Sequence, residues 1–147
     1  MRNKLGLNNE KLFSVEKIIV TTKFIFNNDI FSLEFLRQLH LFLFSDLYYE
    51  EDLAFRELTQ EEITYIEVLF NSIKEVCIRE YNNVDMLMET LAKFWELQIF
   101  KDGNTRTLLG YLSILNKAFI LNLDIDLNKE ISSSPSELNS QIFVNQK

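Results

Sequence analysis

Apolar side chains recur every three or four positions along most of the chain, which is the period of an α-helix with one buried face. The pattern predicts helices over about residues 9–26, after Ser32, after Thr59, over about residues 85–99 and after the break at 102–104. No segment alternates apolar and polar residues in the manner of a half-buried strand. We therefore predict an all-α fold.

Two of these predicted helices begin with capping residues. Ser32 is of a type that accepts a hydrogen bond from a first-turn N–H group. Thr59 and Glu62 have the spacing of a capping box, in which each side chain bonds the backbone N–H of the other residue. We expect residues 1–130 to form one helical domain, and residues 131–147, which include Ser-Ser-Ser-Pro, to form a turn and a short C-terminal tail.

The composition narrows the class of protein. With 147 residues, of which 47% are hydrophobic and 13 are phenylalanine, the chain can bury the core of one globular domain. The net charge of −7 argues against a nucleic-acid partner, which requires a basic face. No apolar run reaches the roughly 18 residues of a membrane span, and residues 1–13 lack the apolar stretch of a signal peptide. Together with the single cysteine, these features predict a cytoplasmic protein with no membrane partner.

Most residues that often carry chemistry have a structural interpretation in this chain. His40 lies in a helix with apolar residues on nearly every side, so we interpret it as a buried structural histidine rather than a catalytic one. Cys77 and Trp95 lie on apolar stripes and are expected in the core. One histidine and one cysteine cannot form a structural zinc site. The acidic run at residues 50–52 is most simply a solvated loop.

The exception is the break between the last two predicted helices, Asp102-Gly103-Asn104. Successive amides of Gly103, Asn104 and Thr105 at the start of a helix can form a nest for a phosphate. Arg106 can then pair with phosphate oxygens, and Asp102 can hold Mg²⁺. A plain corner between two helices, with glycine at a positive φ and a capping side chain, explains the same residues. Both interpretations stay open on the pattern alone.

The segment around this break resembles a signature of the Fic (Fido-fold) family, H-x-F-x-[DE]-G-N-x-R-x-x-R. Residues 98–109 align with it, and Phe100 matches the aromatic residue that anchors the family's loop in the core. A second segment, residues 39–48, reads LHLFLFSDLY and resembles the family's upstream pattern L-H-x-x-L-F-x-D-[IV]-Y, in which His40 is a residue of the fold. The resemblance implies a single-domain helical Fic fold over residues 1–130.

The resemblance also implies an activity. Typical members transfer AMP from ATP to a hydroxyl group of a target protein, and many are toxins paired with a small antitoxin. In the family, the position of Asp102 holds Mg²⁺ on the phosphates, and Arg106 falls where the β- and γ-phosphates are gripped. The loop amides, at Gly103, Asn104 and Thr105 here, and the side chain at the position of Asn104 cradle the α-phosphate. The implied cofactors are ATP and Mg²⁺, and the implied partners are a target protein and an antitoxin.

Three departures from the family motif concern the chemistry. Gln98 stands where the family has the histidine that deprotonates the target hydroxyl, and a carboxamide has no useful basicity near neutral pH. A positioned base contributes roughly 10²–10⁴-fold to a rate. Leu109 replaces the second phosphate-binding arginine. Thr105 stands where members often have a glycine close to the ligand, but many members have other residues there, so this departure counts for less. We therefore expect a retained phosphate-binding loop with weak or absent AMP transfer.

The segment that docks the target is also altered. After its upstream motif the family has a β-hairpin flap that pairs with an extended stretch of the target, whereas here Thr59 already begins a helix. We expect a short, reduced β-hairpin in the shortened segment. The residues of this target-docking flap are Leu53, Ala54, Phe55 and Arg56.

Three interpretations of the function stay open. The first is a residual or altered nucleotidyl- or phosphotransferase in which Tyr48, Tyr49 or a water molecule replaces the histidine. The second is a pseudoenzyme that binds a nucleotide or a partner protein without chemistry, in a toxin–antitoxin pair or in cell division. The third is an unrelated helical protein that contains Asp-Gly-Asn by chance. The oligomeric state is open as well, because the apolar residues of the first predicted helix fit either a core or a homodimer face. These residues are Ile18, Ile19, Phe24 and Ile25.

Overall fold

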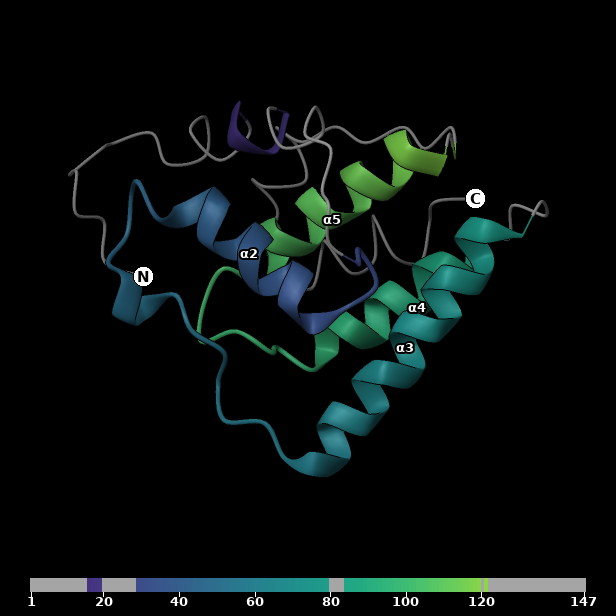
Figure 1. Ribbon diagram of the computed structural model, residues 1–147, viewed down its shortest axis with the longest axis horizontal. Helices are drawn as coiled ribbons and strands as arrows, with labels where there is room; N and C mark the ends of the chain where they lie inside the picture. Colours follow the sequence, from purple (N-terminus) through teal and green to yellow (C-terminus); the bar gives the residue numbers. More distant parts are fainter. Residues whose placement is uncertain (1–15, 20–28, 80–83, 120, 122–147) are drawn as a thin grey trace.

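The computed structural model describes residues 16–19, 29–79, 84–119 and 121, and their helices confirm the predicted all-α class (Figure 1). The elements in chain order are α2 (Leu33–Phe44), the short 3₁₀-helix η1 (Glu50–Asp52), α3 (Gln60–Ile78), α4 (Val84–Glu96) and α5 (Asn104–Phe119). The described residues contain no strand. None of the helices among them is long and apolar enough to cross a membrane.

Both predicted helix caps are present. The Ser32 hydroxyl accepts the N–H of Phe35 at 3.2 Å. At the start of α3, Thr59 Oγ1 accepts the N–H of Glu62, and the Glu62 carboxylate accepts the N–H of Thr59, each at 3.1 Å. Such a reciprocal pair satisfies N–H groups that a helix leaves without intrahelical partners. The local sequence therefore sets where α2 and α3 begin.

Helix α4 ends before the predicted residue 99. Gln98 donates its backbone N–H to the Trp95 carbonyl, three residues back, at 3.1 Å, and it adopts a φ of 48°. A residue in the left-handed conformation just after the last turn is a common way to end a helix. The chain then leaves the helical path, and Phe100 pairs with Phe55 in an isolated antiparallel bridge.

Helix α5 lies at the centre of the core, against α2 on one side and against α3 and α4, which run side by side, on the other (Figure 1). The ring centroid of the fully buried Tyr111 lies 5.9 Å from that of Phe35 in α2 and 6.3 Å from that of Phe70 in α3. Phe70 in turn meets the ring of Phe94 in α4 edge to face, at 4.9 Å. Because α5 is held on both sides, the loop that leads into it has a defined position.

The crossing of α2 and α5 has room for one more methyl group at Gly110. A Cβ atom at this position would lie 3.4 Å from Leu43 Cδ1 and 3.8 Å from Leu39 Cδ1, which are ordinary van der Waals distances. Glycine inside a helix costs about 1 kcal/mol relative to alanine, so Gly110→Ala is expected to raise the free energy of unfolding by about 0.5–1 kcal/mol. Urea unfolding followed by circular dichroism measures this difference. A lower stability of the variant would show that α2 and α5 cannot accommodate the added methyl group.

The first predicted helix is described only at residues 16–19, which are helical. Ile18 is fully buried in the core, whereas Ile19 is 47% exposed. Of the two interpretations left open for the apolar residues of this helix, burial in the core therefore applies to Ile18. The rest of the predicted helix, the domain boundary at residue 130 and the predicted tail over residues 131–147 lie outside the described residues.

Candidate functional site

The predicted loop residues line a hollow of about 260 Å³ between the end of α4 and the start of α5. Its walls are Gln98, Lys101, Asp102, Gly103, Asn104, Thr105 and Arg106. The structure thus brings together every residue predicted for phosphate and metal binding, with Gln98 beside them. Lys101 is a further basic residue of the hollow, and it lies at a motif position where no residue type is specified.

Asn104, the first residue of α5, holds the loop in shape from inside. Its side-chain oxygen accepts the N–H of Phe100 at 2.9 Å. Its side-chain nitrogen donates to the Phe100 carbonyl at 3.0 Å and to Gln98 Oε1 at 3.2 Å. Because the oxygen and both N–H groups of this carboxamide are engaged within the loop, the geometry favours a role in positioning the backbone over a direct phosphate contact by the side chain.

Gln98, at the position of the family's catalytic histidine, is exposed, but its carboxamide is engaged at both ends. Nε2 donates to the Trp95 carbonyl at 2.8 Å, and Oε1 accepts from the Asn104 side chain. These bonds close the end of α4 and connect it to the first residue of α5. The side chain offers neither an acid nor a base near neutral pH.

The start of α5 supplies backbone N–H groups to the hollow. Gly103 adopts a φ of 80°, which glycine reaches without strain, and its own N–H is donated to Asp102 Oδ1 at 2.7 Å. No described residue accepts the N–H groups of Asn104 and Thr105, which belong to the first turn and have no intrahelical partner. Two of the three amides predicted for the nest can therefore bind an anion, at the positive end of the helix dipole.

Arg106 places positive charge beside these amides. Its guanidinium carbon lies 4.7 Å from the centre of the Phe44 ring and 5.7 Å from that of Tyr48, and its Nη1 donates to the Tyr48 hydroxyl at 3.4 Å. Stacking engages the face of a guanidinium, whereas its N–H donors lie around the rim, where their geometry matches phosphate oxygens. Phe44 at the end of α2 and Tyr48 after the following turn therefore hold the cation at the hollow.

Asp102 is the acidic residue among those that line the hollow, and it is exposed. Across residues 16–19, 29–79, 84–119 and 121, no group of three or more His, Cys, Asp or Glu side chains could hold a metal ion. A Mg²⁺ ion at this site would therefore take most of its ligands from phosphate and water, which is the usual way in which proteins bind Mg²⁺ with a nucleotide. Asp102 fits that arrangement as a single protein ligand.

His40 braces the loop from α2. It is fully buried, and its Nε2–H donates to the Asp102 carbonyl at 2.8 Å. Burial, which outweighs the effect of this hydrogen bond, lowers the pKa of His40 to about 4, so the ring is neutral at pH 7. No described residue bonds Nδ1. The prediction of a buried structural histidine is confirmed. Its contact with a loop 62 positions away was not predicted from the sequence.

Phe100, the predicted anchor of the loop, lies in the core. It is 4% exposed. Its ring stacks between His40, at a centroid distance of 3.9 Å, and Phe55, at 4.9 Å. Its predicted burial is therefore confirmed, and the contact with His40 explains how the loop is fixed on α2.

Arg56, predicted as part of the target-docking flap, is engaged with the protein itself. Its guanidinium donates to the Leu97 carbonyl at 2.9 and 3.1 Å and to the Gln98 carbonyl at 2.9 Å. It also pairs with the Glu62 carboxylate, and this hydrogen bond is the main cause that lowers the pKa of Glu62 to about 2. Arg56 therefore ties the end of α4 to the start of α3, which is a structural role.

No β-hairpin forms at the predicted flap. The flap residues are Leu53, Ala54, Phe55 and Arg56. Phe55 instead forms the isolated bridge with Phe100, in which the Arg56 N–H is donated to the Ile99 carbonyl at 2.9 Å. The expected reduced hairpin is corrected to a 3₁₀ turn followed by this single bridge, because the backbone groups of the segment bond the strand-like stretch before the loop rather than each other.

Comparisons with protein-family models, with curated proteins and with solved structures found no match to this chain. The resemblance to the Fic family therefore rests on the two motif segments alone.

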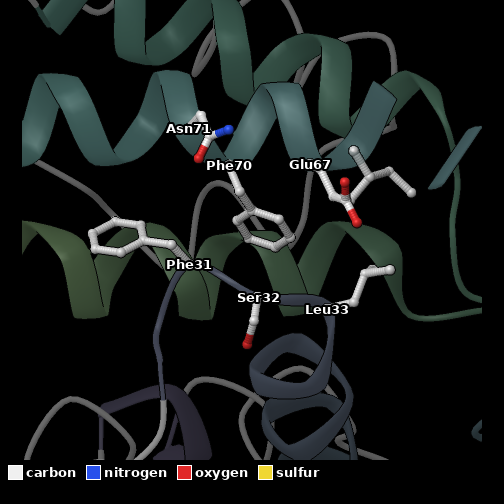
Figure 2. Close-up of a pocket in the computed structure, with 7 residues that line it drawn as sticks. Phe31, Ser32, Leu33, Glu67, Phe70 and Asn71 are labelled. Atoms are coloured by element: carbon white, nitrogen blue, oxygen red, sulfur yellow. The ribbon is translucent and has the colours of Figure 1, made fainter. Parts of the chain in front are cut away.

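A second hollow, of about 340 Å³, lies between α3 and the start of α2 (Figure 2). Its walls are Phe31, Ser32, Leu33, Ile66, Glu67, Phe70 and Asn71. Figure 2 shows the Phe70 ring reaching from α3 toward Ser32, beside Phe31. No basic side chain is among these walls, so this hollow does not share the anion-binding chemistry of the loop. The sequence pattern does not predict it, because its two sides come from separate helices.

Proposed function

We propose that the hollow at the start of α5 binds the phosphates of ATP with Mg²⁺, and that the protein transfers AMP weakly or not at all. The observation that carries this proposal is the convergence of first-turn N–H groups, the Arg106 guanidinium and the Asp102 carboxylate on one hollow. Amides at a helix start together with an arginine are a recurrent way to bind phosphate. The resemblance of the loop to the Fic motif supplies the expectation of ATP as the ligand.

Weak transfer follows from two positions of the motif. Gln98 cannot remove a proton from a target hydroxyl, and its carboxamide is held by Trp95 and Asn104. Leu109 is 2% exposed and belongs to the core, so it contributes no phosphate contact in place of the second arginine. Loss of the base alone lowers a rate by roughly 10²–10⁴-fold. The proposal is therefore a degenerate Fic protein that retains its ligand site.

One observation favours a pseudoenzyme over a transferase with a substitute base. Tyr48, a candidate for that base, is 1% exposed, and its hydroxyl accepts a hydrogen bond from Arg106. A group removed from solvent and engaged with a cation is poorly placed to receive a proton from a target protein. Tyr48 is therefore a poor candidate for the base, which supports binding of the nucleotide without efficient chemistry. Tyr49, which is 43% exposed, and a water molecule stay open as substitutes.

The proposed partners follow from the resemblance. A target protein and a small antitoxin are the macromolecules that a Fic protein would contact in the cytoplasm. In this chain the predicted flap, with Phe55 and Arg56, is bonded to the protein itself, so the edge that would pair with an extended target segment is reduced. This agrees with a protein in which transfer to a target is weak.

Mg·ATP and inorganic triphosphate are expected to bind the wild-type protein and to raise its melting temperature. Trp95 is the single tryptophan, and its Nε1 donates to Thr105 Oγ1 at 3.0 Å, so its fluorescence reports on the loop. Arg106→Ala is expected to weaken binding by about tenfold or more, because a hydrogen bond to a charged group contributes about 1.5–3 kcal/mol. Fluorescence titration and calorimetry measure both affinities.

Arg37→Ala is the matched control for this titration. Arg37 lies on the exposed side of α2 and pairs with Glu34, away from the residues that line the hollow. Its variant is expected to bind as wild type does. The proposal fails if the wild type binds neither ligand, or if Arg106→Ala binds as tightly as the control.

Introducing the missing base is expected to raise AMP transfer. Gln98→His places an imidazole at the family's catalytic position, and histidine is among the residues that tolerate the positive φ found there. With ATP radiolabelled at the α-phosphate, we expect about tenfold or more labelled protein in the variant than in the wild type. Equal, strong labelling of the two proteins would show that another group acts as the base and would contradict the pseudoenzyme.

A further inference from the structure

We infer that Tyr48 positions Arg106 for anion binding, an inference that rests on the proposed function. Tyr48 is 1% exposed and directly follows the turn after α2. Its hydroxyl accepts from Arg106 Nη1 at 3.4 Å, and its ring centre lies 5.7 Å from the guanidinium carbon. One buried tyrosine therefore contacts the guanidinium of the hollow through both its ring and its hydroxyl.

A long, flexible cation gains affinity for a ligand when its geometry is fixed before the ligand arrives. The guanidinium of Arg106 lies over the Phe44 ring as well as the Tyr48 ring, so its face is set by two aromatic side chains. The Tyr48 hydroxyl fixes one donor on its rim, and with it the rotation of the guanidinium within that plane. The stacking and the hydrogen bond together define the direction of the other N–H donors at the edge of the guanidinium. These donors are the part of an arginine that phosphate oxygens contact.

Tyr111, which is also buried among the described residues, provides a contrast. Tyr111 is fully buried, and its hydroxyl donates to the backbone carbonyl of Ile30 at 2.7 Å. That hydrogen bond joins α5 to the segment before α2 and involves no residue that lines the hollow. Each of these hydroxyls takes part in a partly buried hydrogen bond, and of the two it is the Tyr48 hydroxyl that contacts a cation of the proposed site.

The test compares Tyr48→Phe with Tyr111→Phe, using Mg²⁺ and inorganic triphosphate as the probe. Phenylalanine keeps the ring over the guanidinium and removes the hydroxyl alone. Tyr48→Phe is expected to weaken triphosphate binding by about three- to tenfold, which corresponds to one hydrogen bond. Tyr111→Phe is expected to bind as wild type does. Melting temperatures without ligand are expected to fall by similar amounts in the two variants.

A double-mutant cycle separates positioning from general stabilisation. If Tyr48 acts through Arg106, adding Tyr48→Phe to Arg106→Ala causes no further loss of affinity. An equal loss in both backgrounds, or wild-type affinity in Tyr48→Phe, overturns this inference while the proposed function stands. Absence of triphosphate binding by the wild type overturns both.

Discussion

Asn104→Ala is expected to lower the free energy of unfolding by about 2–4 kcal/mol, because it leaves buried polar groups of the loop without partners. The Asn104 side chain bonds both the N–H and the carbonyl of Phe100, at 2.9 and 3.0 Å. Phe100 is 4% exposed, so water cannot readily replace these bonds. The loss therefore exceeds the roughly 1 kcal/mol of an ordinary hydrogen bond.

Urea unfolding followed by Trp95 fluorescence measures this loss. Asn71→Ala is the control, because Asn71 is exposed on α3 and its replacement should change stability by less than about 0.5 kcal/mol. The Asn104 variant should also lose affinity for inorganic triphosphate, since the amides of the loop are no longer held in place. A change as small as that of the control would show that the loop keeps its shape without the carboxamide.

Lowering the pH from 7 to 4 is expected to destabilise the fold by roughly 3 kcal/mol through His40 alone. Burial holds the pKa of this imidazole at about 4, against 6.5 as its ordinary value. Between these two values the unfolded chain binds a proton that the folded chain does not, so stability increases with pH across this range. The contribution of neutral His40 to stability is fully present above about pH 6.5 and is lost as the pH falls toward 4.

Equilibrium unfolding at several pH values checks this expectation, with His40→Gln as the control. Glutamine carries an N–H donor that can reach the Asp102 carbonyl, and it does not titrate. The control should therefore lose little stability between pH 6.5 and 4.5. Glu62 affects stability in a separate pH range. Its pKa is about 2 in the folded protein, against an ordinary value of 4.5, so its stabilising effect is lost only as the pH falls below about 4.5. Equal slopes for wild type and control between pH 6.5 and 4.5 would contradict the role of His40.

Much of the fold could be predicted because its signals are local. Ser32 and Thr59 bond N–H groups within three residues of themselves, so their side chains report the helix starts directly. The Asp-Gly-Asn break lies where the structure has its loop, because Gly103 adopts a positive φ that few other residues accept. The residues of the hollow follow from the same short stretch of chain, at 98–106.

The end of α4 and the absence of a hairpin at the predicted flap could not be predicted in this way. Apolar residues continue past Glu96, so helical spacing favours a longer helix. In the structure, the Leu97 and Gln98 carbonyls are bonded by Arg56, which comes from the segment predicted as a flap. Arg56 thus connects the end of α4 to a segment that forms no hairpin, and the local spacing of apolar residues predicts neither the end of the helix nor this contact.

From the order of its residues alone, this chain specifies its helices, two of their caps and the loop that we propose binds an anion. The tertiary structure decides how that loop is held: His40 bonds it across 62 positions, Tyr48 bonds Arg106 across 58, and Arg56 bonds the end of α4 across 41. The physical reason is that periodicity defines which face of a helix is buried, whereas the partner of that face depends on how the helices pack.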